Sequence, residues 1–131
     1  MFGPAGVLYV YLIYGMYHCA NVVTGPDGDG QAVLIRAIEP FGDLAGMRRA
    51  RPKARRDFDL TNGPGKLCQA LGIDRGHDGL NLCDPASAVR LELCTAEAAG
   101  DVVQTTRIGL SVGQDTPWRW YLGGNPWISK R

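Results

Sequence analysis

Four of the chain's five tyrosines are clustered near its start, at Tyr9, Tyr11, Tyr14 and Tyr17. Aromatic rings stack on nucleobases, at about 1–3 kcal/mol per stacked base, and their faces attract cationic rings. In a strand, Tyr9 and Tyr11 face one side of the sheet and Tyr14 faces the other. Most tyrosines in strands belong to the core, but a large ring at the tip of a hairpin has little core to join. Tyr14 is therefore the first candidate for contact with a ligand.

A single charge, Arg36, interrupts an otherwise apolar segment. A guanidinium in such a place needs a partner, because burying an uncompensated charge costs free energy. Glu39 or Asp43 would provide an ion pair. The alternative is that Arg36 holds a phosphate or the edge of a base at a groove.

The stretch Asn62–Gly72 has the composition of a short helix. Asn62 or Gly63 is suited to cap it, Pro64 suits its first turn, and Gly72 is suited to end it. The free N–H groups of the first turn, the positive end of the helix dipole and Lys66 together favour phosphate binding. The G-x-x-x-x-G-K-[ST] pattern of nucleotide triphosphate loops is absent.

Other kinds of chemistry are poorly supported. Neither His18 nor His77 lies near a convincing nucleophile, which argues against acyl transfer. The cysteines lack C-x-x-C spacing, so we expect no zinc site. No cofactor is expected either. The apolar run Val7–Tyr14 is too short to cross a bilayer. We expect buried thiols at Cys19 and Cys68 in a reduced, cytosolic protein. The remaining cysteines are Cys83 and Cys94.

The elements that must position these groups are mainly strands. A β-branched and aromatic segment, Leu8–Tyr14, predicts a strand buried on both faces, with a hairpin tip at Tyr14–Met16 and a glycine-rich turn at 25–30. We expect helices at Asp43–Ala50 and within Asn62–Gly72. The other predicted strands are Tyr17–Thr24, Ala32–Ile38, Val89–Leu93, Arg107–Val112 and Trp118–Leu122. The sequence thus predicts one α+β domain, a curved, mostly antiparallel β-sheet or open barrel with a few short helices.

The net charge of +1 says little about partners, but its distribution is uneven. Between Arg36 and Lys66 there are eight basic and four acidic residues, a local balance of +4. Such a region either binds phosphates or is a solvated helix face, and the sequence leaves both open.

Four blocks of the sequence together resemble the alkyladenine (3-methyladenine) DNA glycosylase family. They occur in the family's order and span essentially the whole chain, so residues 1–131 are similar to part of one such domain. The blocks are Leu8–Tyr17 leading to Asn21, Val33–Pro40, Gly63–Leu71 and Gly124–Ser129.

The resemblance implies a DNA-repair enzyme that flips alkylated purines out of double-stranded DNA and hydrolyses their N-glycosidic bond. Tyr11 resembles the wall of the base pocket, and Asn21 its floor, which disfavours normal guanine. Arg36 resembles a residue near the flipped nucleotide's phosphate. The residues that match DNA contacts are Tyr14 as the wedge that fills the gap, Met16 and Tyr17 beside it, Lys66 and Asn125.

The family's chemistry implies neither a metal nor a Schiff-base lysine, so strand cleavage is not expected. Alkylation leaves the purine cationic and a good leaving group, and a base is needed to activate water. The resemblance places this general-base glutamate, a second stacking tyrosine and a histidine before Phe2–Pro4, and neither Glu39 nor Glu92 matches the base. We therefore expect no catalytic base within these residues.

Three hypotheses remain. The first is a monofunctional glycosylase, a monomer with no membrane partner, acting in the bacterial cytoplasm at the nucleoid or in a nucleus. The second is a truncated, catalytically inactive module that binds damaged DNA. The third is an unrelated β-barrel ligand carrier with an aromatic lining, which predicts no salt-dependent affinity for DNA.

Overall fold

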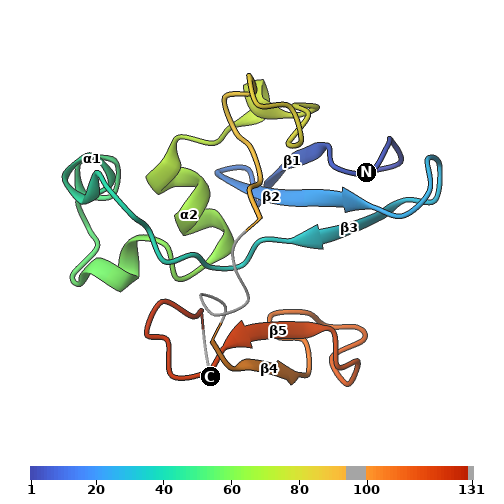
Figure 1. The fold of residues 1–131 in the computed structure, drawn as a ribbon. Coiled ribbons are helices and arrows are strands. Elements are labelled where there is room, and N and C mark those ends of the chain that lie inside the picture. Colours follow the sequence, from blue (N-terminus) through green and yellow to red (C-terminus); the bar gives the residue numbers. More distant parts are fainter. Residues whose placement is uncertain (94–99, 130–131) are drawn as a thin grey trace. The chain divides into compact units, whose positions relative to one another are not determined.

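The computed structural model describes residues 1–93 and 100–129 of the chain (Figure 1). These residues belong to two compact units, one formed by Met1–Glu92 with Trp127–Arg131 and the other by Leu93–Pro126. Each unit is described by itself. No helix among the described residues has both the length and the apolar character that a membrane span requires.

The first unit contains an antiparallel sheet of three strands in the order β1 (Leu8–Ile13), β2 (Tyr17–Thr24) and β3 (Gln31–Leu34). The β1–β2 register runs from Leu8 opposite Val22 to Ile13 opposite Tyr17. The bounds of β2 and the hairpin tip at residues 14–16 are those that the sequence predicts.

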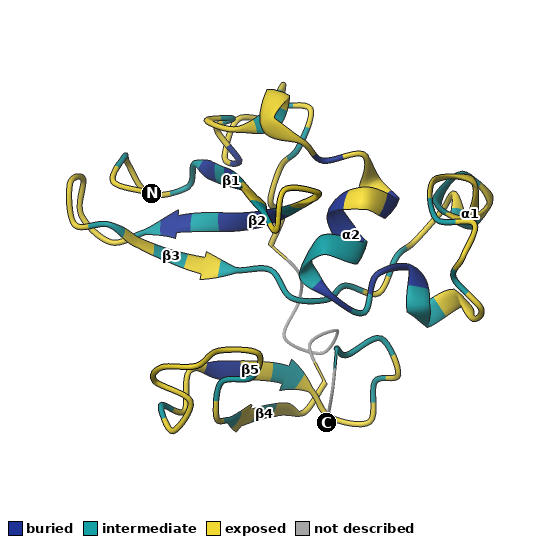
Figure 2. Cartoon of the chain, turned by 180° about the vertical axis from the view of Figure 1, so that it is seen from behind, coloured by how far each residue is buried: buried dark blue, intermediate teal, exposed yellow. Residues whose placement is uncertain are grey.

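The core lies between one face of this sheet and helix α2 (Pro64–Leu71). Leu8 and Val10 on β1 and Ala20 on β2 are buried there against Leu67 and Cys68 of the helix. Figure 2 shows the buried stretches of β2 and α2. Full burial of a side chain the size of leucine stabilises the fold by about 1.5–3 kcal/mol, so this face carries much of the unit's stability.

The opposite face of β1 is only partly covered, so the expectation that this strand is buried on both faces is wrong. Tyr9, Tyr11 and Ile13, which point to that face, are each half-buried. The uniformly apolar sequence of β1 does not distinguish the two faces, whereas the packing of α2 against one of them does.

Both predicted helices are present. Helix α1 (Leu44–Ala50) begins after Asp43, whose Oδ1 accepts a hydrogen bond from Gly46 N at 2.8 Å. Helix α2 starts at Pro64 and ends before Gly72, whose φ of +68° is the left-handed conformation that closes helices. Two short 3-10 helices, η1 (Asp57–Leu60) and η2 (Arg75–His77), were not expected from the sequence.

Strand β3 is shorter than the expected Ala32–Ile38, because the chain leaves the sheet after Leu34. The last contact with β2 is a hydrogen bond from Ile35 N to Ala20 O at 3.0 Å. Ile38 then contacts Thr61, whose hydroxyl donates to Ile38 O at 2.6 Å. Arg36 therefore follows the strand instead of lying within it.

The predicted strand at Val89–Leu93 is also absent. Leu91 N donates one backbone hydrogen bond to Leu82 O at 2.9 Å, but no ladder forms. The alternating charged and apolar residues of this segment do not reflect a strand. Arg90 Nε pairs with Glu92 Oε1 at 2.6 Å, and Leu91 between them is exposed.

The second unit contains an antiparallel pair, β4 (Val102–Thr105) and β5 (Arg119–Leu122). Strand β5 confirms the prediction at Trp118–Leu122 to within one residue. The strand expected at Arg107–Val112 is wrong, because Gly109 takes a φ of +73° in the middle of it. The α+β class and the antiparallel pairing are confirmed, with the described strands forming two open sheets.

Candidate functional site

The tip of the β1–β2 hairpin presents a large aromatic side chain to solvent. Tyr14 is 80% exposed, and its φ of +54° is the one positive value among the described residues other than glycine. Gly15 follows with a φ of +68°, and Met16 N donates to Ile13 O at 3.3 Å. Positive φ at both central residues is what type I′ hairpin turns require, and asparagine or glycine normally supplies it. The ring of Tyr14 is thus held away from the core by a turn that is unfavourable for tyrosine.

Met16 and Tyr17 flank this tip as expected, with 67% and 43% of their surfaces exposed. Tyr17 also lies against the first turn of α2. A Cβ atom at Gly65 would come within 3.1 Å of the Tyr17 Cβ, so the absence of a side chain at Gly65 permits this close approach. The start of β2, next to the hairpin tip, therefore packs directly against the first turn of α2.

Tyr11 and Asn21 lie on the sheet face opposite the core. Tyr9 is paired with Asn21 across the strands, and Tyr11 with Cys19. The rings of Tyr9 and Tyr11 are stacked, with centroids 5.5 Å apart and planes inclined by 30°. Asn21 is 7% exposed, and its Nδ2 donates to Tyr9 O at 3.2 Å. This face thus combines a partly exposed aromatic wall with a fixed amide.

The charge of Arg36 influences Cys19, which lies on the same face of the sheet as Tyr11. Burial raises the pKa of the Cys19 thiol, while a hydrogen bond with Tyr11 and the charge of Arg36 oppose that rise. Burial likewise raises the pKa of the Tyr11 hydroxyl, and Cys19 adds to the effect. Tyr11, Cys19 and Asn21 therefore share one face of the sheet, and the charge of Arg36 acts on Cys19. Sequence reasoning identified Cys19 only as a buried thiol, although its cross-strand position opposite Tyr11 follows from the predicted hairpin.

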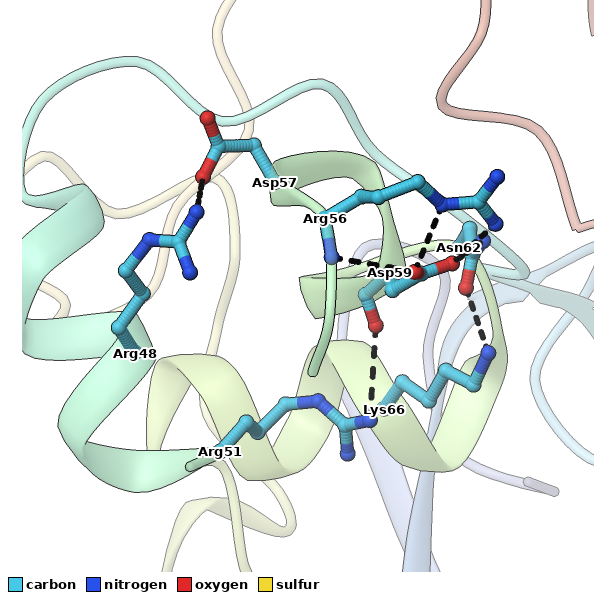
Figure 3. Close-up of polar contacts among 7 residues, drawn as sticks. All are labelled: Arg48, Arg51, Arg56, Asp57, Asp59, Asn62 and Lys66. Carbon is cyan, nitrogen blue, oxygen red and sulfur yellow. Dashed lines mark hydrogen bonds and ion pairs between the residues drawn. The ribbon is translucent and has the colours of Figure 1, made fainter. Parts of the chain in front are cut away.

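Lys66 lies in the first turn of α2, where its Nζ donates to Asn62 Oδ1 at 2.7 Å. Asn62 Nδ2 in turn donates to Asp59 Oδ1 at 3.2 Å. Asp59 also binds both Nε and Nη2 of Arg56, each at 3.0 Å (Figure 3). The hydrogen bonds from Arg56, followed by smaller contributions from its charge and from Asn62, lower the pKa of Asp59 to about 2. Sequence reasoning missed this network, although its residues recur at helical spacings of three and four.

Much of the basic region between residues 48 and 56 makes internal contacts. Arg48 forms an ion pair with Asp57, and Arg49 lies 3.7 Å from Asp43. Arg51 Nη1 donates to Gln69 Oε1 at 2.7 Å, and burial lowers the pKa of this guanidinium. These pairs favour the interpretation of Arg48 and Arg49 as a solvated helix face.

Asn125 belongs to the second unit, where its N–H donates to Leu122 O at 3.3 Å. It is placed only within that unit. A hollow of about 250 Å³ lies beside the hairpin in the first unit and is lined in part by Met16, Tyr17 and Asp74. A second hollow, of about 580 Å³, is lined in part by Leu71 and Arg90, so neither of these two includes Tyr11 or Asn21.

Among the described residues, no three histidine, cysteine or acidic side chains are grouped so as to hold a metal ion. Cys94 lies outside the described residues. The side chains of the first unit can stack on a planar ring through Tyr11 or Tyr14, form hydrogen bonds through Asn21, and attract anions through Arg36, Arg56 and Lys66.

Comparison with known proteins gives a consistent result. Residues 1–126 match the family described as methylpurine-DNA glycosylase (MPG). Relatives named "Putative 3-methyladenine DNA glycosylase" include one from Burkholderia cenocepacia, 47% identical over 98% of this chain and 62% of its own length. One from Nocardia farcinica is 50% identical over 98% of the chain and 61% of its own length, and one from Methanoculleus marisnigri is 46% identical over 100% and 68%. The chain thus spans about three fifths of the first two relatives.

Proposed function

The chain belongs to the methylpurine-DNA glycosylase family, and from this premise we propose that it recognises alkylated purines of the 3-methyladenine type in double-stranded DNA. It flips the damaged nucleotide out of the duplex, and water then hydrolyses the N-glycosidic bond of that nucleotide. We place it in DNA base-excision repair, as a monomer in the compartment that holds the DNA. That compartment is the cytoplasm of a bacterium or the nucleus of a eukaryote.

The observation that carries this proposal is the ring of Tyr14, 80% exposed on a turn with a φ of +54°. An exposed aromatic side chain in a strained conformation is unfavourable for folding, and such strain is concentrated at functional sites. A ring held out from a narrow hairpin is suited to enter the base stack and to occupy the space of a flipped nucleotide. Met16 and Tyr17 widen this apolar wedge.

The flipped base is received on the face that carries Tyr11 and Asn21. The half-buried Tyr11 stacks on the cationic purine, which the negative face of its ring attracts. Asn21, fixed by its hydrogen bond to Tyr9 O, crowds the exocyclic amine of a normal guanine. Arg36 neutralises the phosphate of the flipped nucleotide. Lys66 and Asn125 contact the DNA away from this face.

The chemical step needs a base to activate water, since the cationic purine already leaves readily. The resemblance assigns this role to no residue of the chain, and Glu39 and Glu92 do not match it. The second candidate function is a module that binds damaged DNA without cleaving the glycosidic bond.

The experiment is to incubate the purified chain with matched duplexes that contain either 1,N6-ethenoadenine, 3-methyladenine or no lesion, and to follow binding and base release together. Release above background supports the enzyme and refutes the inactive module. Lesion-selective binding without release supports the module. Equal or absent affinity for all duplexes, at low as well as high salt, contradicts both and leaves the ligand carrier.

A further inference from the structure

Asp59 is the centre of a polar network at the start of α2 (Figure 3). Its side chain is 20% exposed and accepts hydrogen bonds from Arg56 Nε and Nη2, both at 3.0 Å, and from Arg56 N at 3.2 Å. Asn62 lies between this carboxylate and Lys66, donating to one and accepting from the other. One anion and one amide therefore fix the positions of two cations.

The guanidinium of Arg56 is held on one edge and on one face. Asp59 binds its Nε and Nη2, and its Cζ lies 4.2 Å from the centroid of the Phe58 ring. Phe58 itself packs edge-to-face against Trp127, with centroids 6.5 Å apart. The Arg56 side chain is nevertheless 64% exposed, and Nη1 has no hydrogen-bond partner within residues 1–93 and 100–129. Its second N–H edge is therefore available to an external acceptor.

The Lys66 ammonium is in the same situation, because Asn62 accepts one of its three N–H bonds and the described part of the chain shows no acceptor for the other two. Lys66 directly follows Gly65, which lies against Tyr17 next to the hairpin tip. Arg56 and Lys66 outweigh Asp59 by one positive charge. The network is therefore a cationic surface beside the hairpin tip, with its donors held in place before any ligand arrives.

We propose that Asp59 and Asn62 position Arg56 and Lys66 as a clamp for backbone phosphates of the DNA strand next to the hairpin. This inference rests on the proposed function and adds to it one further DNA-contacting residue, Arg56, and two positioning residues. An anchored guanidinium binds a phosphate with two parallel hydrogen bonds and loses less side-chain entropy than a free one. The carboxylate of Asp59 thus favours binding of an anion, although its own charge is of the wrong sign.

The first test compares two arginines that each pair with an aspartate. Arg56→Gln and Arg48→Gln remove the same charge, but only Arg56 belongs to the clamp. Binding to a lesion-containing duplex is measured by fluorescence anisotropy at several salt concentrations. We expect Arg56→Gln to weaken binding about 3- to 10-fold and to lower the salt dependence by about one phosphate contact. Arg48→Gln should change the affinity less than about twofold, and equal effects of the two would overturn the proposal.

The second test asks whether Asp59 positions its neighbours. Asp59→Asn and Asp57→Asn both make the protein more positive, so an effect of net charge alone predicts tighter binding for both. We expect Asp59→Asn to bind about 2- to 5-fold more weakly, with a reduced salt dependence, and Asp57→Asn to bind at least as tightly as the parent. Asp59→Asn binding equally or more tightly than the parent contradicts the clamp.

Thermal unfolding shows whether each variant is folded. If Asp59→Asn is not, Asn62→Ala decides in its place, because it frees Lys66 while leaving the Arg56–Asp59 pair intact. Unchanged affinity and salt dependence in Asn62→Ala would then refute the proposal. Absence of any DNA binding by the parent chain overturns the proposed function together with the clamp, whereas failure of the clamp alone leaves parental binding intact.

Discussion

The two turns of the three-stranded sheet follow opposite rules. The turn between β2 and β3 consists of glycine, proline and aspartate, with positive φ values only at Gly25, Gly28 and Gly30. Its polar groups bond to one another, as Asp29 N donates to Pro26 O at 3.1 Å. The turn between β1 and β2 instead places Tyr14 at positive φ and exposes Met16.

This difference separates a turn that serves folding from one that serves binding. The second turn, between β2 and β3, consists of residues that adopt turn conformations at low cost. The first turn contains large apolar side chains that neither stabilise the turn nor join the core. Their exposure is compensated by the rest of the hairpin, where paired strands and the packing of α2 impose the geometry on Tyr14.

The largest effect is expected from Tyr14→Ser, which removes the ring but keeps the hairpin. Loss of about 1–3 kcal/mol of stacking weakens lesion-selective binding roughly 5- to 150-fold. The measurement is the affinity for an ethenoadenine duplex relative to the undamaged duplex. Asp27→Ser, in the other turn, is the matched control and should leave this ratio unchanged. An unchanged ratio in Tyr14→Ser would remove the wedge from the proposed function.

Gly65→Ala tests whether the first turn depends on its contact with α2. The added methyl group would lie 3.1 Å from the Tyr17 Cβ and 3.3 Å from its Cγ, so the hairpin or the helix must shift. Overpacking of this kind costs about 1–3 kcal/mol, although alanine is otherwise the better helix former. Denaturant unfolding should show a lower midpoint. A raised midpoint would mean that the hairpin moves freely with respect to α2.

The sequence predicts these elements where local chemistry decides the structure. Both hairpin turns, the bounds of β2 and the ends of α2 follow from glycine, proline and periodicity within a few residues. Strand β4 could not be found this way, because Val102–Thr105 is a strand only through its pairing with β5. At Arg107–Val112 the apolar pattern is present, but Gly109 adopts a φ of +73° and interrupts the strand.

The residues of the candidate site also fall into those that local chemistry predicts and those that depend on tertiary contacts. The exposure of Tyr14 follows from its place at a hairpin tip, and the shared face of Tyr11 and Asn21 follows from strand alternation. The effect of the Arg36 charge on Cys19 could not be predicted, since the chain leaves β3 early and turns toward Thr61. The network around Asp59 depends on the 3-10 helix η1, whose sequence is that of a charged loop.

Gly28→Ala tests the second turn by strain alone. Gly28 has a φ of +88°, and a Cβ there would meet nothing within 4 Å. The expected loss of stability, about 1–2 kcal/mol, therefore comes from the backbone conformation and not from a clash. Thermal unfolding should show a lower midpoint, while the affinity for damaged DNA stays at the parental value. A fall in affinity without loss of stability would show that the second turn also contacts DNA.

Tyr14→Asn should separate stability from binding within the first turn. Asparagine tolerates positive φ better than tyrosine, so the substitution relieves strain and stabilises the fold by about 0.5–1 kcal/mol. The unfolding midpoint should rise slightly while lesion-selective binding falls as in Tyr14→Ser. Gly15→Asn is the control. Glycine already adopts the φ of +68° at position 15 at low cost, so this substitution should not stabilise the fold. A lower midpoint for Tyr14→Asn would mean that the tyrosine ring stabilises the free protein.

The smallest effect concerns pH, and it tests whether the surface beside the first turn keeps its charges. Because the pKa of Asp59 is lowered to about 2, mainly by Arg56, the ionised form is favoured by folding. Its contribution is fully present above the unfolded pKa of about 4 and is lost as the pH falls toward 2. His77 lowers the pKa of Asp74 and acts in the same direction. Unfolding measured from pH 6 to pH 2 should therefore show a smaller acid-dependent loss in Asp59→Asn than in the parent chain. Identical acid profiles would mean that the Arg56–Asp59 pair does not persist in solution, and the cations beside the hairpin would then lack the anchor that distinguishes them from the solvated arginines of α1.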